Sequence, residues 1–334
     1  MRAALVGCGS IATVHAQVLQ GMEGCELVGF ADIIPERAEK FAAEYGGIAY
    51  TSLEELLEAQ KPDVLHICTP HYLHVPMAVA ALASGTHVFM EKPPAISNEQ
   101  FAQLEEAVAA ADRRLGICFQ NRYNPCVQTV KDLLASGEAG AVKGARAVVT
   151  WNRKAPYYTK SGWRGSLAME GGGALINQSV HTLDLLVCLL GRPVWTDACL
   201  ANHHLKEVIE VEDMMEAYIR FEDTAACFYA TTAYCTDEPP LIEVCCENMK
   251  IRMEDPGVEL IYPDGTRKRL ETEVLRPLGK GYWGSGHGAC IEDFYRCITE
   301  GTPYAQDIQG IKNTAKLMLA LYESAREGHA VQLD

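Results

Sequence analysis

One stretch of sequence decides the fold class of this chain: Ala3-Ala4-Leu5-Val6-Gly7-Cys8-Gly9-Ser10-Ile11-Ala12. A short apolar run leads directly into a G-x-G-x-x-A pattern. Gly7 permits the tight turn, Gly9 lets the backbone approach a pyrophosphate, and Ala12 is small enough for close packing of helix on sheet. The helix that follows offers unpaired N–H groups to phosphates at its N-terminus. The stretch therefore predicts a dinucleotide-binding strand–turn–helix unit, with Gly7, Gly9, Ser10, Ile11 and Ala12 at the cofactor.

Four further apolar runs follow this one at regular intervals. Runs this short and continuous are typical of parallel strands buried on both faces. Between them lie helical patterns, such as the capping box at Ser97 and Gln100. Strand and helix in alternation predict an α/β doubly wound parallel sheet, a Rossmann domain. The five predicted strands are 3–6, 25–31, 64–68, 86–90 and 115–119.

A carboxylate marks the end of the second predicted strand. Asp32 stands 25 residues after Gly7, where it can accept hydrogen bonds from the ribose hydroxyls. The next residues are Ile33-Ile34-Pro35, so no cation directly follows that would bind a 2′-phosphate. This favours NAD over NADP.

The rest of the chain has a different pattern, with consecutive strand-like segments and turn residues between them. We predict a Rossmann domain over 1–122 and a substrate-binding and oligomerisation domain over 123–334, α+β, with an open, mostly antiparallel sheet. Two helical patterns, near 286–299 and 307–326, belong to that domain or pack back on the first. The predicted strands are 144–151, 194–201, 214–221, 225–234 and 241–246, with turns at Asn248, 255–257 and 263–265.

Composition narrows the function classes. The chain has 334 residues, 48% of them hydrophobic, and a formal net charge of −15, which is ordinary for a globular protein and unfavourable for nucleic acid or an anionic membrane. The densest basic run, Arg267-Lys268-Arg269, falls in a predicted hairpin. We expect no membrane-spanning segment, and no signal peptide because glycine comes too early. The 13 cysteines form no Cys-x-x-Cys pair, which argues against a metal site and for a reduced, cytoplasmic protein.

Two further motifs contain candidate catalytic residues. Glu91-Lys92-Pro93-Pro94 follows a predicted strand at its carboxyl end, where open α/β sheets bind ligands. A lysine there can serve as a general base if burial or a neighbouring cation lowers its pKa; the alternative is a surface lysine in a turn.

The second motif is a helix, apolar over 174–190, that follows Gly171-Gly172-Gly173. Asn177, His181 and Asp184 form one polar stripe on it. They either satisfy one another structurally or line a site, with His181 as acid or base, Asp184 fixing its tautomer and Asn177 binding a hydroxyl. His203-His204 and the acidic run 210–213 are interpreted as solvated surface.

Together these motifs resemble the Gfo/Idh/MocA family, the glucose–fructose oxidoreductase and inositol dehydrogenase group. The resemblance covers essentially the whole chain and includes the stretch from Asp293-Phe294 to Ala325. It implies the two domains described above, assembly as a homodimer or homotetramer, and NAD(P)-dependent hydride transfer at a secondary hydroxyl of a sugar, glycoside or cyclitol. The family's lysine matches Lys92 and its site histidine matches His181. The family also places Thr69, Pro70, His74, Glu91 and Gln120 near the cofactor.

Asn177 departs from the commoner pattern, because many members carry Asp there. A subset has this Asn-Gln variant together with a Tyr-Tyr…Trp-Arg-Gly segment, matched here by 157–158 and 163–165. Aromatic faces stack on sugar rings, and Arg164 can hold hydroxyls or a carboxylate; ordinary loop packing is the alternative for the tyrosines. The residues expected to bind substrate are Arg122, Tyr157, Tyr158, Trp163, Arg164, Asn177 and His181.

Three function classes remain open. The first is a dehydrogenase in which Lys92 or His181 removes the hydroxyl proton. The second is a redox-assisted glycosidase or lyase that passes through a transient 3-keto sugar and recycles bound NAD. The third is a non-catalytic dinucleotide-binding regulator, which would need neither Lys92 nor His181. Net NADH formation separates the first two.

Overall fold

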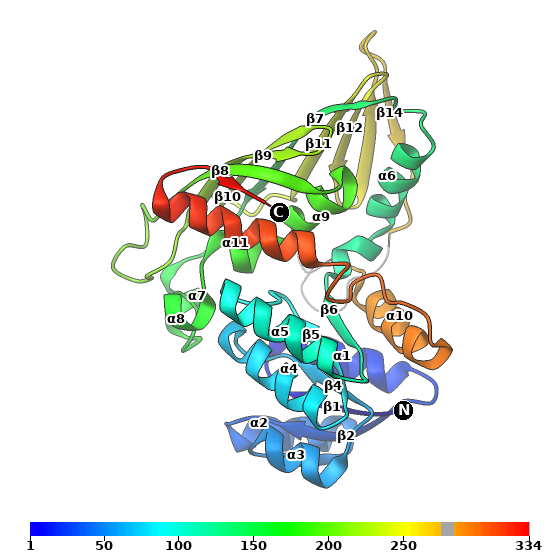
Figure 1. Ribbon diagram of the computed structural model, residues 1–334, viewed down its shortest axis with the longest axis vertical. Helices are drawn as coiled ribbons and strands as arrows, with labels where there is room; N and C mark the ends of the chain where they lie inside the picture. The colour runs from blue at the N-terminus through cyan, green and yellow to red at the C-terminus, as the bar shows by residue number, and fades with distance from the viewer. Residues whose placement is uncertain (275–283, 334) are drawn as a thin grey trace. The chain divides into compact units, whose positions relative to one another are not determined.

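The computed structural model describes residues 1–274 and 284–333, and the chain divides into two compact units (Figure 1). The first unit comprises Met1–Gln120 and the described part of Pro277–Lys312. The second comprises the described parts of Asn121–Arg276 and Asn313–Asp334. The first break falls two residues before the predicted boundary of 122, and a C-terminal segment belongs to the first unit.

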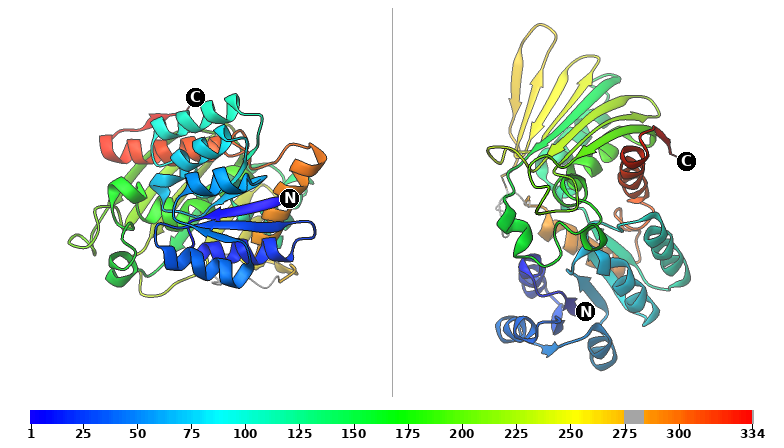
Figure 2. Two further views of the ribbon diagram at one scale, coloured as in Figure 1. Left: turned by 90° about the horizontal axis from the view of Figure 1, so that it is seen from below. Right: turned by 90° about the vertical axis from the view of Figure 1, so that its left-hand side faces the viewer.

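The first unit is built on a six-stranded parallel sheet in the order β3-β2-β1-β4-β5-β6. Figure 2 shows helices above and below these strands, the doubly wound arrangement expected from sequence. The strands are β1 (Arg2–Val6), β2 (Glu26–Ala31), β3 (Ile48–Tyr50), β4 (Val64–Ile67), β5 (His87–Glu91) and β6 (Leu115–Cys118). The helices are α1 (Ser10–Gly21), α2 (Pro35–Tyr45), α3 (Leu53–Gln60), α4 (His74–Ala83), α5 (Asn98–Ala110) and α10 (His287–Glu300).

Helix α10 packs closely on β6 and α1. A Cβ atom on Gly116 would lie 2.6 Å from Phe294 of α10, so the strand needs glycine there. Phe294 in turn packs on Phe89 of β5, with 5.2 Å between ring centroids, and both rings are fully buried. The predicted helix near 286–299 is therefore part of the core of the Rossmann unit.

The second unit is built on a nine-stranded sheet in the order β14-β13-β12-β11-β7-β10-β9-β8-β15. All neighbouring strands pair antiparallel except β7 and β10, which run parallel. The strands are β7 (Val142–Thr150), β8 (Pro193–Ala201), β9 (Met214–Phe221), β10 (Ala225–Thr231), β11 (Leu241–Cys246), β12 (Lys250–Glu254), β13 (Gly257–Ile261), β14 (Arg267–Leu270) and β15 (Val331–Gln332). The three predicted turns join β11 to β14, and Arg267-Lys268-Arg269 lies in a hairpin strand as expected.

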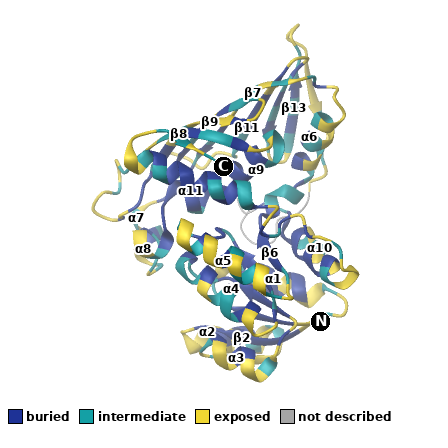
Figure 3. Cartoon of the chain, viewed as in Figure 1, coloured by how far each residue is buried: buried dark blue, intermediate teal, exposed yellow. Residues whose placement is uncertain are grey.

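Helices cover one face of this sheet (Figures 1 and 3). They are α6 (Pro125–Ala135), α9 (Val180–Leu190) and α11 (Lys312–Glu327); the short helices α7 (Ala155–Thr159) and α8 (Leu167–Glu170) and a π-helical turn (Ala174–Ser179) precede α9. Along β9, Met215 and Ile219 point to the helices and are buried, whereas Tyr218 between them is 45% exposed on the other face. This alternation is the mark of an antiparallel sheet with one open face.

The helical stretch Leu167–Leu190 is long and apolar enough to span a membrane, whereas the sequence predicts no such segment. Within the protein 72% of its most apolar window is buried, so it is the core helix of the second unit.

The prediction that 210–213 is solvated surface is wrong. Glu210 is exposed, but Glu212 and Asp213 are 3% and 0% exposed. The Asp213 carboxylate accepts hydrogen bonds from the backbone N–H groups of His203 and His204, at 2.7–3.1 Å. Both buried acids therefore stabilise loops beside the π-helical turn.

Candidate functional site

The glycine turn after β1 has the geometry of a phosphate-binding loop. Gly7 adopts φ +86°, and a Cβ atom there would lie 2.8 Å from the backbone of Cys68, so only glycine fits. A Cβ atom on Gly9 would meet nothing within 4 Å, which leaves open space over this part of the turn. Helix α1 starts at Ser10 without a side-chain cap, so its first N–H groups are available to an anion.

Asp32 ties the second strand to this turn. Its Oδ2 accepts a hydrogen bond of 2.9 Å from the Cys8 N–H, and its Oδ1 accepts one of 2.9 Å from the Ile34 N–H. Each carboxylate oxygen keeps a second lone pair for a ribose hydroxyl. Arg37, which the sequence reading did not consider, lies close enough to lower the pKa of the Cys8 thiol, against the larger raising effects of burial and Asp32.

The turn after β4 supplies the next edge of the cofactor site. Thr69 Oγ1 is buried and has no hydrogen-bond partner in the described part of the chain, so a ligand hydroxyl or amide can satisfy it. His74 was expected at the cofactor. Its Nδ1 lies 2.9 Å from the Pro93 carbonyl and its Nε2 3.0 Å from the Thr69 carbonyl. His74 thus braces the Thr69-Pro70 turn against the Lys92-Pro93 segment and offers no free ring nitrogen to the cofactor.

Glu91, also expected near the cofactor, belongs to a buried chain of hydrogen bonds. Its Oε1 lies 2.9 Å from His15 Nε2, His15 Nδ1 lies 2.9 Å from His66 Nδ1, and His66 Nε2 lies 3.0 Å from the Tyr295 hydroxyl. Burial alone would raise the pKa of Glu91, but the bond and charge of His15 and the charges of His287 and Lys92 hold it below its ordinary value.

These bonds fix the side chain of Glu91, the residue directly before Lys92. The donor atoms of His15, Glu91 and Cys118 are close enough together to hold a metal ion. Both ring nitrogens of His15 already face His66 and Glu91, so the arrangement does not favour one. Gln120, the last residue of the first unit, is 3% exposed and accepts from the Cys118 thiol at 3.8 Å.

In the second unit the stripe predicted on one helix is split by a change of helix type. Asn177 lies in the π-helical turn and His181 in the first turn of α9. Such π-helical turns occur frequently at functional sites. Asn177 Nδ2 donates to Glu170 Oε1, and His181 lies part-exposed beside the fully buried Val180.

Asp184 does not have the role that the sequence predicted. Its Oδ2 accepts from Arg122 Nε at 2.8 Å, and its Oδ1 accepts from Arg122 Nη2 at 2.6 Å and from Thr314 Oγ1 at 2.7 Å. The carboxylate is therefore occupied by Arg122 and Thr314 instead of fixing the His181 tautomer. This ion pair ties the Arg122 side chain, which is 12% exposed, to α9. The role of Arg122 in substrate binding stays a prediction.

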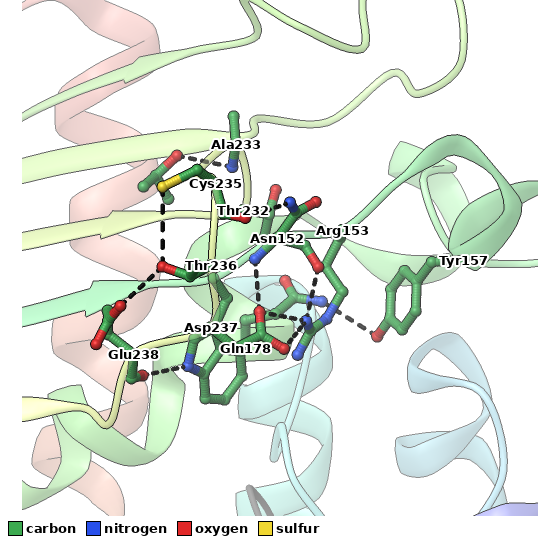
Figure 4. Close-up of polar contacts among 12 residues, drawn as sticks. Asn152, Arg153, Tyr157, Gln178, Thr232, Ala233, Cys235, Thr236, Asp237 and Glu238 are labelled. Atoms are coloured by element: carbon green, nitrogen blue, oxygen red, sulfur yellow. Dashed lines mark hydrogen bonds and ion pairs between the residues drawn. The ribbon is translucent and has the colours of Figure 1, made fainter.

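An aromatic and cationic wall precedes this helix. The Arg164 guanidinium lies 4.5 Å from the ring centre of Tyr157 and 5.0 Å from that of Trp163, and its buried Nε has no hydrogen-bond partner among the described residues. Gln178 Nε2 donates to the Tyr157 hydroxyl at 3.2 Å. Arg153, also missed by the sequence reading, bonds Asp237 through Nη1 at 3.0 Å and lies 5.5 Å from the ring centre of Tyr157 (Figure 4). Arg164 and Tyr157 thus present a charged and an aromatic group together.

Tyr158 differs from its neighbour. It is 2% exposed, packs with Ile209 and Val211, and its hydroxyl donates to Thr232 Oγ1 at 3.3 Å. The substrate-binding role predicted for it therefore gives way to the packing alternative.

Two buried acids complete the second unit's site. Glu170 accepts from the Gly165 N–H and from Asn177, and burial is the main reason that its pKa is raised to about 7. Glu212 accepts from the N–H groups of Gly173 and Leu175 at 2.8 and 3.0 Å, and burial raises its pKa as well. The sequence contains one indication that Glu212 is part of the site. The apolar residues Ile209 and Val211 alternate with Glu210 and Glu212, which is unusual for a fully solvated acidic segment.

The residues of the first unit fit a bound dinucleotide. The open space over Gly9, the uncapped start of α1, the Asp32 carboxylate and the unsatisfied Thr69 hydroxyl form a cradle with suitable partners for phosphate and ribose. This arrangement is the one expected of the fingerprint at 7–12.

Comparison with known proteins agrees with this geometry. Residues 1–120 match the oxidoreductase family with an NAD-binding Rossmann fold, and residues 127–252 match the GFO/IDH/MocA C-terminal domain. The chain is 26% identical to the scyllo-inositol 2-dehydrogenase (NAD(+)) of Bacillus subtilis, over 100% of this chain and 96% of that protein. It is 30% identical to the D-glucoside 3-dehydrogenase of Escherichia coli, over 58% of this chain and only 55% of the relative.

A solved structure is similar over the whole length. The WlbA dehydrogenase from Bordetella pertussis, in complex with NADH and UDP-GlcNAcA, is 28% identical and superimposes with a TM-score of 0.86, covering 100% of this chain and 98% of that one. The phosphate-binding turn, the two-sheet architecture and these matches together identify the chain as a member of the Gfo/Idh/MocA family of NAD-dependent oxidoreductases.

Proposed function

We propose that the protein is a dehydrogenase that transfers a hydride between NAD and a secondary hydroxyl of a sugar, glycoside or cyclitol. The observation that supports this best is a dinucleotide cradle in one unit, with the Arg164–Tyr157 contact and the successive helical positions of Asn177 and His181 in the other. The relatives act on glucosides and inositols, substrates dense in secondary hydroxyls.

Each side chain has a role in this proposal. Asp32 and the turn at 7–12 bind the cofactor, which when bound accepts the hydride from the carbon that carries the hydroxyl. Lys92 or His181 takes the proton of that hydroxyl, so the substrate loses one hydride and one proton and becomes a ketone. Tyr157 and Trp163 stack on the sugar ring, and Asn177 holds a hydroxyl.

Arg164 narrows the substrate class. Its unsatisfied Nε lies beside two aromatic rings, a setting that suits a carboxylate next to a sugar ring. The structural relative was solved with UDP-GlcNAcA, whose uronate carboxylate is such a group. We therefore propose sugar acids and their nucleotide conjugates as the first substrates to test.

The test is a screen of glucose, methyl glucosides, glucuronate, myo-inositol and UDP-N-acetylglucosaminuronate with NAD. Reduction of NAD in proportion to ketone supports the proposal. Release of aglycone from glycosides without net NADH would instead indicate the redox-assisted glycosidase. Binding of NAD with no turnover of any compound in the screen would contradict both.

Two further features support proposals for the assembly and the compartment. The open face of the nine-stranded sheet carries Trp195, Tyr218, Cys199 and Cys227, and we propose that a second copy covers it in a homodimer or homotetramer. All 13 cysteines are free thiols, in keeping with a reduced, cytoplasmic protein. Size-exclusion chromatography with light scattering tests the assembly.

A further inference from the structure

A fully buried carboxyl group, that of Glu170, lies next to Asn177. Glu170 ends α8 and its side chain belongs to a 0% exposed residue. Its Oε1 accepts a hydrogen bond from Asn177 Nδ2, and its Oε2 accepts one from the backbone N–H of Gly165.

The position of Glu170 is fixed from both sides. Gly165 adopts φ +82°, and a Cβ atom there would lie 2.5 Å from Ile209, so its N–H has one orientation. Asn177 is held in the π-helical turn, where its own N–H donates to the Gly173 carbonyl at 3.1 Å. The carboxyl group therefore bridges two anchored pieces of backbone.

The direction of these hydrogen bonds depends on the proton of Glu170. An ionised carboxylate can only accept, so it selects the NH₂ side of the Asn177 amide and turns Oδ1 away from itself. The carbonyl oxygen of a protonated carboxyl group is a better acceptor than its hydroxyl oxygen, so the Gly165 N–H keeps Oε2 as the carbonyl oxygen and favours the proton on Oε1. A protonated Oε1 donates, and the amide then has to turn its Oδ1 toward Glu170 and its NH₂ away.

We propose that Glu170 is a positioning residue that sets whether Asn177 presents an accepting oxygen or a donating NH₂ group to the substrate hydroxyl. The inference rests on the proposed function, in which Asn177 holds that hydroxyl. With Glu170 ionised, Asn177 Oδ1 accepts a hydrogen bond from the substrate hydroxyl and so orients that hydroxyl. With Glu170 protonated, this orientation of the hydroxyl is lost.

The groups around Glu170 make both states accessible. Burial favours the protonated form, and the charge of Glu212 acts in the same direction. The hydrogen bonds from Gly165 and Asn177 and the charge of Arg164 favour the ionised form. Tyr157, Tyr158 and Tyr322 lie close enough for the charge of Glu170 to act on them, and each has its pKa raised mainly by burial. Activity should therefore rise with pH as Glu170 ionises near neutrality.

The substitution Glu170→Gln tests the direction of the bond. The glutamine oxygen must serve the Gly165 N–H, so its NH₂ group faces Asn177 and forces the amide to turn. We expect kcat to fall about 10- to 100-fold, the scale of a misplaced reacting group, and the acidic limb of the pH–rate profile near 7 to disappear.

The double variant Glu170→Gln with Asn177→Asp should rescue the enzyme. Asp accepts from the glutamine NH₂ with one oxygen and faces the substrate with the other, so we expect kcat within about tenfold of wild type. Glu210→Gln is the matched control, because Glu210 accepts from the Leu167 N–H at 2.8 Å and caps the same short helix without touching Asn177. We expect it to stay within about twofold of wild type.

A measurement without substrate separates this inference from the proposed function. Infrared difference spectra of wild type against Glu170→Gln report the titration of this one carboxyl group, and Asn177→Ala should raise its pKa by removing a donor. A titration unmoved by Asn177→Ala, or a double variant no faster than Glu170→Gln alone, would overturn the proposal. If the titration moves but no hydroxyl compound is oxidised, the proposed function fails and the link between Glu170 and Asn177 stands.

Discussion

Replacing Arg122 by methionine distinguishes a structural ion pair from a substrate contact. The pair with Asp184 is almost completely buried, with side-chain exposures of 12% and 2%, and has two hydrogen bonds of 2.6 and 2.8 Å. Removing one partner of such a pair leaves the other charge buried and costs about 3–5 kcal/mol. Thr314 remains as a donor to Asp184 and offsets part of this loss.

The assay is thermal unfolding followed by circular dichroism, with NAD and substrate kinetics on the same samples. For a unit of this size, each kcal/mol corresponds to roughly 2–4 °C, so we expect Arg122→Met to lower Tm by roughly 6–20 °C. The double variant Arg122→Met with Asp184→Leu should recover much of the loss, because an apolar pair of similar volume replaces both charges. A variant with unchanged Tm but a raised KM would refute this reasoning and restore Arg122 as a substrate-binding residue.

Three other variants test the remaining roles. Lys92→Ala and His181→Ala should each lower kcat by ~10²- to 10⁴-fold while NAD binding, measured by fluorescence titration, stays nearly unchanged; a folded variant with normal turnover would exclude that residue as the acid or base. Asp32→Ala should weaken NAD binding and reduce its preference over NADP, since a carboxylate that repels the 2′-phosphate is lost; equilibrium titration of both cofactors measures this, and an unchanged ratio would contradict it. The pKa of Glu170 is raised from 4.5 to about 7 in the folded protein, so its stabilising effect is complete below pH 4.5 and is lost as pH rises through about 7. We expect wild type to lose about 3 kcal/mol more than Glu170→Gln between pH 4.5 and 8, measured by urea unfolding; equal losses would show that this carboxyl does not titrate there.

The first unit could be predicted closely because its signals are local. Five of its six strands are continuous apolar runs, and the glycine turn has one interpretation once a strand precedes it. The strand that was missed, β3, has three residues, none of them buried, and pairs only with β2 at the edge of the sheet. Its sequence, Ile48-Ala49-Tyr50, is apolar, but three residues are too few to show the period that identifies a strand.

For the second unit, the sequence indicated which residues belong to the candidate site but not which contacts they make. The sequence left open whether Asn177, His181 and Asp184 satisfy one another or line a site. In the structure Asn177 bonds to Glu170 and Asp184 bonds to Arg122. A glutamate before three glycines is ordinarily a surface charge, and its burial depends on the Gly165 N–H, which no local pattern reveals. Hydrogen bonds between segments far apart in sequence are therefore what the sequence reading lacked.

Helix α10 comes late in the chain but packs on the sheet of the first unit. The core of that unit can therefore be completed only after most of the chain has been translated. Phe294 and Tyr295 of α10 complete a core whose other residues, such as Phe89 and His66, are made some 200 residues earlier. At roughly 5–20 residues per second, translation from 120 to 312 takes roughly 10–40 s. During that interval the nascent sheet exposes Gly116 and its apolar neighbours, so the cofactor domain has to be sheltered or remain loosely folded until the last helices emerge. A fragment cut at residue 122 would reproduce this unfinished state permanently.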